Sequence, residues 1–445
     1  MRDDIFGLSS LRMFPQTSSS PPPPTTQHAS ASKTAPTTQR ASASSTPSSF
    51  ASELARASRA RAAASASKRY VSPLKQSVVP GSKIVPPKTT TTKSSTPAGL
   101  SRSSLSPSVG RGAPAKSVAP LPRPESARPA TAPTSSAPMA LSEYPHPDRD
   151  NGRGMHWVPT TSQSRSAVDR LVAEAQKMGV KWVTFLNDGA NVGQNDYLVS
   201  KLVGAGIEPI MRLYSATLEP IKGDIEGMVR HYVGMGVHYF QPFNEPNLSV
   251  EQPDGVPSVE RYLDTWIPAA QAILRGGGLP GFGSLAPGGD MNDIDFLQRA
   301  MEGLTSRGQL GLLDRGWLSM HNYTHNRPIE ERADSDGFFK FRAYNRILRG
   351  ALGRDLPIIG TEGGTFVGEQ EDPDLPAVDA GTAVNMATQA YRYMRDQREP
   401  WNFAYSFWTI ANEAGGGSDP RFAQQALFKA DGSASPIVSA LQALG

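Results

Sequence analysis

The sequence predicts an α/β fold: a closed (β/α)8 TIM barrel preceded by a long disordered N-terminal segment. Three observations support this prediction. Short apolar runs alternate eight times with helical patterns between residues 141 and 445, and polar side chains follow most of these runs. Residues 1–140 show no such alternation. Alternating strands and helices imply a parallel sheet, and eight such units imply its closure into a barrel.

Residues 1–140 are expected to form a disordered tail or linker, and residues 141–445 a single folded domain. The tail is dominated by Ser, Thr, Ala and Pro, and it contains four aromatic residues and no Trp. Such a composition buries too little apolar surface to offset the conformational entropy of the chain. All 6 Trp residues lie beyond residue 150, so the hydrophobic core belongs to the second part.

The two parts differ in charge. Residues 1–140 carry 18 Lys/Arg and 4 Asp/Glu, a net charge of +14, whereas the whole chain is +4. Residues 141–445 therefore have a net charge of −10, which makes the folded domain unsuited to binding nucleic acid. The basic tail is either a solvated linker or a segment that contacts an anionic surface or polymer.

Targeting signals are scarce in the sequence. The first residues, MRDDIFGLSSLRMFPQ, lack the apolar core of a secretory signal peptide. No run approaches the roughly 18–20 apolar residues of a membrane span. The chain has no Cys, which excludes disulfides. Ser/Thr/Pro-rich stalks suit proteins that work outside the cell, which is an association of composition alone. An extracellular or cell-surface location would follow from the class of substrate, and the export route is open.

The predicted strands and helices follow each other along the chain. The strands span residues 154–158, 180–188, 208–214, 237–247, 281–289, 317–324, 356–364 and 402–412. The helices lie near residues 164–178, 196–205, 225–235, 258–275, 293–306, 338–352, 382–398 and 437–444. Ser164 and Ser258 stand where helix N-caps are expected. An open doubly wound sheet is the alternative, but no Gly-rich phosphate loop follows the first strand.

In (β/α)8 barrels the active site lies at the C-terminal ends of the strands. The polar and aromatic side chains expected there are His156, Trp157, Asn187, Asp188, Arg212, Tyr214, Asn244, Glu245, His321, Tyr323, Glu362, Trp408 and Asn412. Two of them are glutamates, on the fourth and seventh strands. The others are hydrogen-bonding groups and flat apolar rings, which suit a carbohydrate ligand.

Two carboxylates on opposite sides of one barrel mouth suit the hydrolysis of a glycosidic bond. One carboxyl group protonates the departing oxygen while the other attacks the anomeric carbon, and in retaining enzymes they stand about 5–5.5 Å apart. The two groups need different environments, because one must be protonated and the other ionised. Glu245 and Glu362 are therefore the candidate catalytic pair.

Three motifs carry a resemblance to a known clan. FNEPN (243–247), IGTEGG (359–364) and SFWTIAN (406–412) resemble those of the clan A retaining glycoside hydrolases, of the family 5-like or family 39-like kind. The resemblance covers essentially all of residues 150–445. It implies that Glu245 is the general acid/base and Glu362 the nucleophile of a double displacement. It also implies a poly- or oligosaccharide substrate and no cofactor.

The same resemblance implies roles for further residues. Asn244 matches the residue that binds the sugar 2-hydroxyl, and Trp408 the platform beneath the cleaved sugar. His321 and Tyr323 match a sixth-strand pair near the nucleophile. Arg212 matches an arginine that supports the nucleophile, although the clan commonly carries it on the second strand and here it falls on the third. His156, Trp157 and Asn187 are further candidates for substrate contact, by their position at strand ends.

Other interpretations stay open. The Asn-Glu-Pro triplet also fits a turn that enters a helix. A barrel that binds glycan without cleaving it, or a transglycosylase, would share most of these residues. His321 and His325 have a spacing that would suit a metal, but no third ligand stands nearby, so no metal is expected. We expect a monomer; the sugar, its linkage and endo or exo action are open.

Overall fold

The computed structural model describes residues 137–445 with the exception of 325, 332–336, 369–375, 413–421 and 424. The predicted disordered tail therefore lies almost entirely outside the described residues. His325 lies outside them too, as does most of the acidic loop between the seventh strand and its helix. The boundary at residue 140 remains a prediction.

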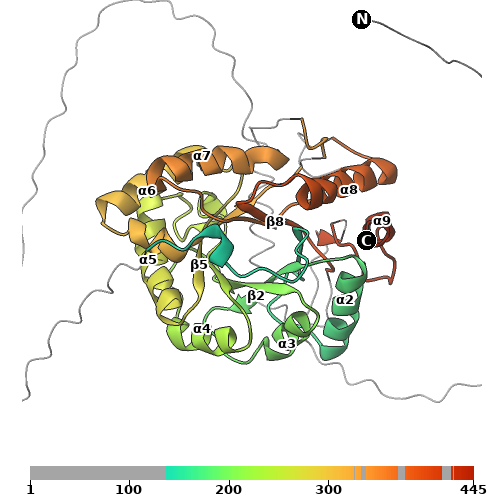
Figure 1. Ribbon diagram of the computed structural model, residues 1–445, viewed down its shortest axis with the longest axis horizontal. Helices are drawn as coiled ribbons and strands as arrows, with labels where there is room; N and C mark the ends of the chain where they lie inside the picture. Colours follow the sequence, from blue (N-terminus) through green and yellow to red (C-terminus); the bar gives the residue numbers. More distant parts are fainter. Residues whose placement is uncertain (1–136, 325, 332–336, 369–375, 413–421, 424) are drawn as a thin grey trace, which may run out of the picture. The chain divides into compact units, whose positions relative to one another are not determined.

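Eight parallel strands form a closed barrel in which each strand pairs with its neighbours in chain order. The last strand pairs with the first, which closes the sheet (Figure 1). The strands are β1 (Arg153–His156), β2 (Trp182–Asp188), β3 (Glu208–Tyr214), β4 (Tyr239–Pro242), β5 (Leu279–Leu285), β6 (Trp317–His321), β7 (Ile358–Glu362) and β8 (Asn402–Phe407). The predicted (β/α)8 barrel is confirmed.

Helices surround the barrel and carry the chain from the end of one strand to the start of the next (Figure 1). They are α2 (Arg165–Lys177), α3 (Asp196–Gly204), α4 (Ile225–Gly234), α5 (Val259–Arg275), α6 (Asp293–Ser306), α7 (Phe341–Leu352), α8 (Ala380–Asp396) and α9 (Pro436–Ala443). Short 3-10 helices are η1 (Leu141–Glu143), η2 (Ser249–Glu251), η3 (Leu310–Arg315) and η4 (Phe338–Lys340). Among the described helices, none is long and apolar enough to cross a membrane.

Side-chain caps start the helices where the sequence predicts them. Ser164 accepts a hydrogen bond from the amide of Ala167, and Ser258 accepts one from Arg261. Both satisfy a backbone donor that the first helical turn leaves open. The predicted bounds of three helices lie within one residue of the observed ones, because the cap and the apolar periodicity agree there. These helices are α4, predicted at 225–235, α5 at 258–275 and α6 at 293–306.

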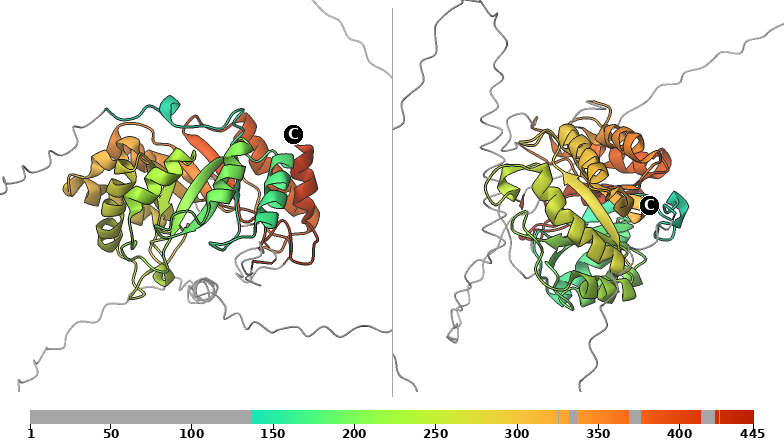
Figure 2. Two further views of the ribbon diagram at one scale, coloured as in Figure 1. Left: turned by 90° about the horizontal axis from the view of Figure 1, so that it is seen from below. Right: turned by 90° about the vertical axis from the view of Figure 1, so that its left-hand side faces the viewer.

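Large side chains fill the barrel at the N-terminal ends of the strands. Trp182, Tyr239, Trp317 and Phe403 pack there in one buried cluster. The segment around η1 lies across this end of the barrel (Figure 2), and Tyr144 completes the cluster with a 2.7 Å hydrogen bond from its hydroxyl to the Gly316 carbonyl. This end of the barrel is therefore filled by side chains, and the predicted site residues lie at the other end, where the strands finish.

The strands end earlier than the sequence predicts at two important places. β4 ends at Pro242, although the prediction extended it to Asn247. Phe243 and Glu245 adopt positive φ values of 64° and 32°, and a residue in that conformation cannot continue a strand ladder. β8 likewise ends at Phe407, so Trp408 lies just beyond it. The functional residues thus sit in the turns after the strands.

Candidate active site

Three ionisable side chains converge at the C-terminal mouth of the barrel. Glu245 follows β4, His321 ends β6 and Glu362 ends β7. One carboxylate oxygen of each Glu and one imidazole nitrogen of His321 lie within 4.8 Å of one another. The exposed fractions of these residues are 2%, 0% and 4%. The pairing of β6 with β7 places His321 directly opposite Glu362. Two candidate catalytic carboxylates are therefore brought together, as the sequence predicts.

Glu362 is surrounded by hydrogen-bond donors. Nη1 of Arg212 donates to its Oε1 at 2.6 Å, and the hydroxyl of Tyr323 donates to its Oε2 at 2.9 Å. Arg212 lies on β3, so the strand count from the sequence is correct. A cation and a hydroxyl that both donate to one carboxylate favour its ionised form.

The residues after Glu362 allow the chain to turn close to β8. A side chain at Gly363 would collide with the ring of Tyr405, and Gly364 has a φ of 137° that L side chains rarely adopt. Both positions therefore need glycine. The Gly-Gly pair in TEGG thus lets the chain pass close to β8 directly after the carboxylate.

Glu245 has a different set of neighbours. Its Oε1 lies 2.9 Å from Nδ1 of His321, and its Oε2 accepts a weak 3.3 Å hydrogen bond from the amide of Asn244. Its own backbone amide donates to the Ser284 carbonyl on β5 at 3.0 Å. The positive φ of Glu245 costs of the order of 1 kcal/mol and is maintained by these contacts.

His321 faces both carboxylates. Its Nδ1 lies 2.9 Å from Glu245, while its Nε2 lies 3.6 Å from Oε1 of Glu362. The second distance is too long for a hydrogen bond. Of these two contacts, the imidazole therefore makes the closer one with Glu245.

His156 and Trp408 lie beside this cluster. Their rings pack with centroids 4.2 Å apart, and Phe422 packs against the other side of Trp408. Burial lowers the pKa of His156 to about 3, with Arg212 and His321 acting in the same direction and Glu362 opposing them. Among the described residues neither ring nitrogen of His156 has a hydrogen-bond partner. A neutral imidazole with two open nitrogens is suited to hydroxyl groups of a ligand.

Two predicted site residues do not join the cluster. Asn187 uses its amide to hold its own loop, donating to the carbonyls of Gly189 and Asn191 at 2.9 and 3.0 Å. Its carbonyl accepts from Asn195, so its polar atoms are engaged within the structure. Trp157 is completely buried in the large apolar cluster to which the helices contribute. Both serve the scaffold in this conformation.

Two polar residues near Glu245 were not predicted from the sequence. Asn247 makes three hydrogen bonds to the loop after β5, and Glu251 accepts a 2.9 Å hydrogen bond from the amide of Asn244. Asn247 is the last residue of the predicted fourth strand, two residues after Glu245, but it was not selected as a site residue. Glu251 lies beyond every predicted strand end, and no signal in the sequence pointed to it.

The Glu245–His321–Glu362 cluster also has the donor types of a metal site. The observed contacts fit hydrogen bonding better, because Arg212 and Tyr323 already approach the two oxygens of Glu362. A guanidinium 2.6 Å from a carboxylate oxygen would repel a cation placed there. The expectation that no metal is required remains a prediction.

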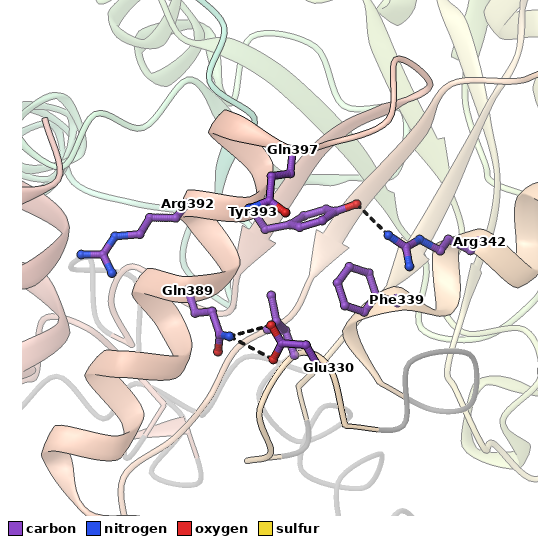
Figure 3. A pocket seen from close by; sticks show the side chains of 8 residues that line it. Glu330, Phe339, Arg342, Gln389, Arg392, Tyr393 and Gln397 are labelled. Carbon is purple, nitrogen blue, oxygen red and sulfur yellow. Dashed lines mark hydrogen bonds between the residues drawn. The ribbon is translucent and has the colours of Figure 1, made fainter. Parts of the chain in front are cut away.

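A hollow lies away from these residues, between the start of α7 and the second half of α8 (Figure 3). Its lining includes Glu330, Phe339, Arg342 and Tyr393. The polar groups are largely paired with each other: Gln389 donates to Glu330, and Arg342 donates to Tyr393. None of the predicted site residues lines this hollow.

Comparison with known proteins gives fold-level similarity only. No family model and no curated protein matches the chain. Among solved structures, it is similar to a monomeric β-xylosidase from Caulobacter crescentus, with 15% identity and a TM-score of 0.47, covering 70% of this chain and 69% of the other. It is also similar to the GH39 enzyme from Xanthomonas axonopodis pv. citri, with 16% identity and a TM-score of 0.46, covering 71% of each chain.

A third solved structure comes from another family. It is a GH128 endo-β-1,3-glucanase from Pseudomonas viridiflava, with 15% identity and a TM-score of 0.46, covering 66% of this chain and 98% of the other. These similarities do not place the chain in a family. What its site can do chemically follows from its own side chains.

Proposed function

We propose that this protein is a retaining glycoside hydrolase that acts on a poly- or oligosaccharide. The observation that carries the proposal is the pair of buried carboxylates at the barrel mouth. A carboxylate oxygen of Glu245 and one of Glu362 lie within 4.8 Å of each other. Retaining enzymes hold their carboxyl groups about 5–5.5 Å apart, whereas inverting enzymes need about 6.5–9.5 Å to admit a water molecule. The spacing here supports the retaining mechanism.

The unequal environments of the two carboxylates support a division of roles. Glu362 receives hydrogen bonds from Arg212 and Tyr323, which favour the ionised form that a nucleophile needs. Glu245 contacts an imidazole and an amide instead. Glu245 is therefore the proposed proton donor, and Glu362 the proposed nucleophile.

In the first step a carboxylate oxygen of Glu362 bonds to the anomeric carbon while the glycosidic C–O bond breaks. Glu245 gives its proton to the departing oxygen, so the leaving group departs as an alcohol. In the second step Glu245, now ionised, takes a proton from water as that water attacks the same carbon and releases Glu362. Together, the two steps return both side chains to their starting protonation states.

Neighbouring side chains are proposed to hold the sugar. Trp408, packed between His156 and Phe422, would offer its ring as a platform for the apolar face of the sugar. The open nitrogens of His156 would bind hydroxyl groups, and Asn244 would approach the 2-hydroxyl. No cofactor takes part in this scheme.

The test is hydrolysis of a panel of aryl β-glycosides, with the anomer of the first-formed sugar read by NMR. The wild type should hydrolyse at least one of them with retention of configuration. Glu245→Gln and Glu362→Gln should lose most of this activity, whereas Glu208→Gln should keep it. Glu208 is a matched control because it is a buried carboxylate at the opposite end of the barrel, paired with His238 at 2.8 Å.

Other outcomes would favour the alternatives. Products longer than the substrate would indicate a transglycosylase, which passes the same intermediate to another sugar. Glycan binding without turnover of any substrate in the panel would indicate a non-catalytic barrel. An inverted product would contradict the proposed mechanism while keeping the class of enzyme.

A further inference from the structure

Three uncharged polar side chains form a buried hydrogen-bond network among the strands that carry the candidate site. Oγ of Ser319 on β6 donates to Oε1 of Gln241 on β4 at 3.0 Å and lies 2.8 Å from Oγ1 of Thr361 on β7. The exposed fractions of Gln241, Ser319 and Thr361 are 0%, 0% and 1%. Because β5 stands between β4 and β6 in the sheet, the contact of Gln241 with Ser319 is made by side chains across the inside of the barrel.

The donors and acceptors in this network fix its direction. The amide nitrogen of Gln241 donates to the Phe243 carbonyl at 3.2 Å. A carbonyl can only accept, so Oε1 is the atom of Gln241 that faces Ser319. The one hydroxyl hydrogen of Ser319 is then used on Gln241, and Thr361 must donate to Ser319. The Met320 carbonyl also faces the Thr361 hydroxyl, but at the longer distance of 3.4 Å.

Both ends of the network lie next to the proposed catalytic residues. Gln241 holds the carbonyl of Phe243, whose φ of 64° begins the turn that carries Glu245. Thr361 directly precedes Glu362, where the pairing of β6 with β7 shifts its register. Irregularities of this kind re-aim side chains next to active sites. The network therefore joins the two places where the backbone beside a candidate carboxylate departs from a regular strand.

The turn of Glu245 is held from two sides. After Glu245, the side chain of Gln252 donates to the Pro246 carbonyl at 2.6 Å. Before it, the backbone pairing of β4 with β5 ends at Phe240. Gln241 continues the attachment through its side chain, and it does so to β6 rather than to β5.

We propose that Gln241, Ser319 and Thr361 are positioning residues of the proposed glycoside hydrolase: their hydrogen bonds hold the turn of Glu245 in place relative to Glu362. This inference rests on the proposed function. Double displacement needs both carboxyl groups at fixed positions around the anomeric carbon. A misplacement of about 1 Å can lower the rate of such a reaction by about 100-fold.

The test compares two substitutions at Thr361 in the full chain. Thr361→Val keeps the shape of the side chain and removes the hydroxyl, whereas Thr361→Ser keeps the hydroxyl and removes a methyl group. With an aryl glycoside that the wild type hydrolyses, kcat should fall by about 10- to 100-fold in the Val variant and stay near the wild-type value in the Ser variant. KM should change little in either, because the residues proposed to hold the sugar are unaltered.

The melting temperature separates positioning from stability. Thr361→Ser leaves a small cavity at a buried site, so this variant should melt at a lower temperature than the wild type while it keeps kcat. If Thr361→Val fails to fold, Ser319→Ala removes the middle hydroxyl from another strand and must show the same loss of kcat.

Thr388→Val is the matched control. Thr388 is also a buried threonine, and its hydroxyl donates to the Val384 carbonyl at 2.8 Å. It lies on α8, among the helices around the barrel. The control loses the same hydroxyl group as Thr361→Val and should keep the wild-type kcat.

A double variant tests whether the three groups act as one network. Gln241→Met breaks one end and Thr361→Val the other, and Ser319 joins the two residues. Because either change undoes the same alignment, the double variant should lose little more kcat than the worse single variant. A loss equal to the product of the two single losses would contradict the network.

Failure of this inference is distinct from failure of the proposed function. A wild type that hydrolyses no glycoside would overturn both. An active wild type whose kcat is unchanged by Thr361→Val would overturn the positioning role alone. Equal losses of kcat in Thr361→Val and Thr361→Ser, or the same loss in Thr388→Val, would also overturn it, because activity would then follow stability rather than the Thr361 hydroxyl.

Discussion

The guanidinium of Arg212, on β3, donates a 2.6 Å hydrogen bond to Oε1 of Glu362, at the end of β7. The two residues stand 150 positions apart in the chain, and closure of the barrel brings them face to face across its mouth. Their side chains are 10% and 5% exposed, so this ion pair is shielded from solvent.

Removal of Arg212 alone should therefore destabilise the fold. Arg212→Met leaves a buried carboxylate without its cation, which typically costs about 3–5 kcal/mol. In the double variant Arg212→Met/Glu362→Gln no unpaired charge remains, so much of that loss should be recovered. Urea denaturation of the two single variants and the double variant measures the coupling. Strictly additive losses would show that the pair does not interact as described.

Truncation of the proposed acid/base should affect substrates according to their leaving groups. Glu245→Ala removes the proton donor, so cleavage of an alkyl or sugar leaving group should slow by about 10²–10⁴-fold. A dinitrophenyl leaving group departs without protonation, and its first step should remain near the wild-type rate. Stopped-flow release of the phenol measures this step. An equal loss for both kinds of leaving group would contradict the assignment.

Much of the fold is predictable from the sequence because local signals agree there. α6 is predicted at its observed bounds, Asp293–Ser306, where an Asn cap precedes a regular apolar stripe. Strand ends are less predictable. Glu245, which has a positive φ, donates its backbone amide to the Ser284 carbonyl on β5, and the local sequence does not show such a contact. The prediction consequently extended β4 too far.

The candidate site was predictable only in its outline. Strand-end reasoning finds Glu245, His321 and Glu362, because barrel closure brings all strand ends to one mouth. It also selects Asn187, whose amide turns to its own loop, because the sequence does not show which way a side chain beyond a strand end points. Glu251 escapes such reasoning altogether, since its contact with Asn244 arises from the path of a loop.

The buried His156 should make stability depend on pH. Burial lowers its pKa to about 3 in the folded protein, against about 6.5 in the unfolded chain. Between these values only the unfolded chain binds the proton, so stability falls as pH drops below 6.5 and is fully present above it. From pH 7.5 to pH 5 the loss from this residue should be about 2 kcal/mol.

The comparison with His156→Gln isolates this contribution. The variant lacks the titrating group, so its loss of stability over the same pH interval should be smaller by that amount. Denaturant unfolding at the two pH values measures both proteins. His238, whose pKa is raised by Glu208, contributes with the opposite sign but is common to both proteins. Parallel pH profiles would show that His156 is not buried as a neutral group.

Asn247 should stabilise the turn that carries Glu245. Its side chain donates to the carbonyls of Ala286 and Met291 and accepts from the amide of Ala286, at 2.8, 3.0 and 2.9 Å. Asn247→Ala leaves these buried backbone groups without partners and should cost about 1–3 kcal/mol. Thermal unfolding measures the loss, and kcat should fall as well because Glu245 is two residues away. A variant as stable as the wild type would contradict this role.

The central claim is that Glu362 forms a covalent bond to the sugar. The most direct measurement is incubation with 2-fluoro-glycosides of several sugars, followed by digestion and mass spectrometry of the peptides. The account predicts a sugar attached to Glu362, with no such adduct in Glu362→Gln, and the reactive glycoside would identify the sugar that the site accepts. An adduct on a different residue, or no adduct from any sugar that the enzyme hydrolyses, would contradict it.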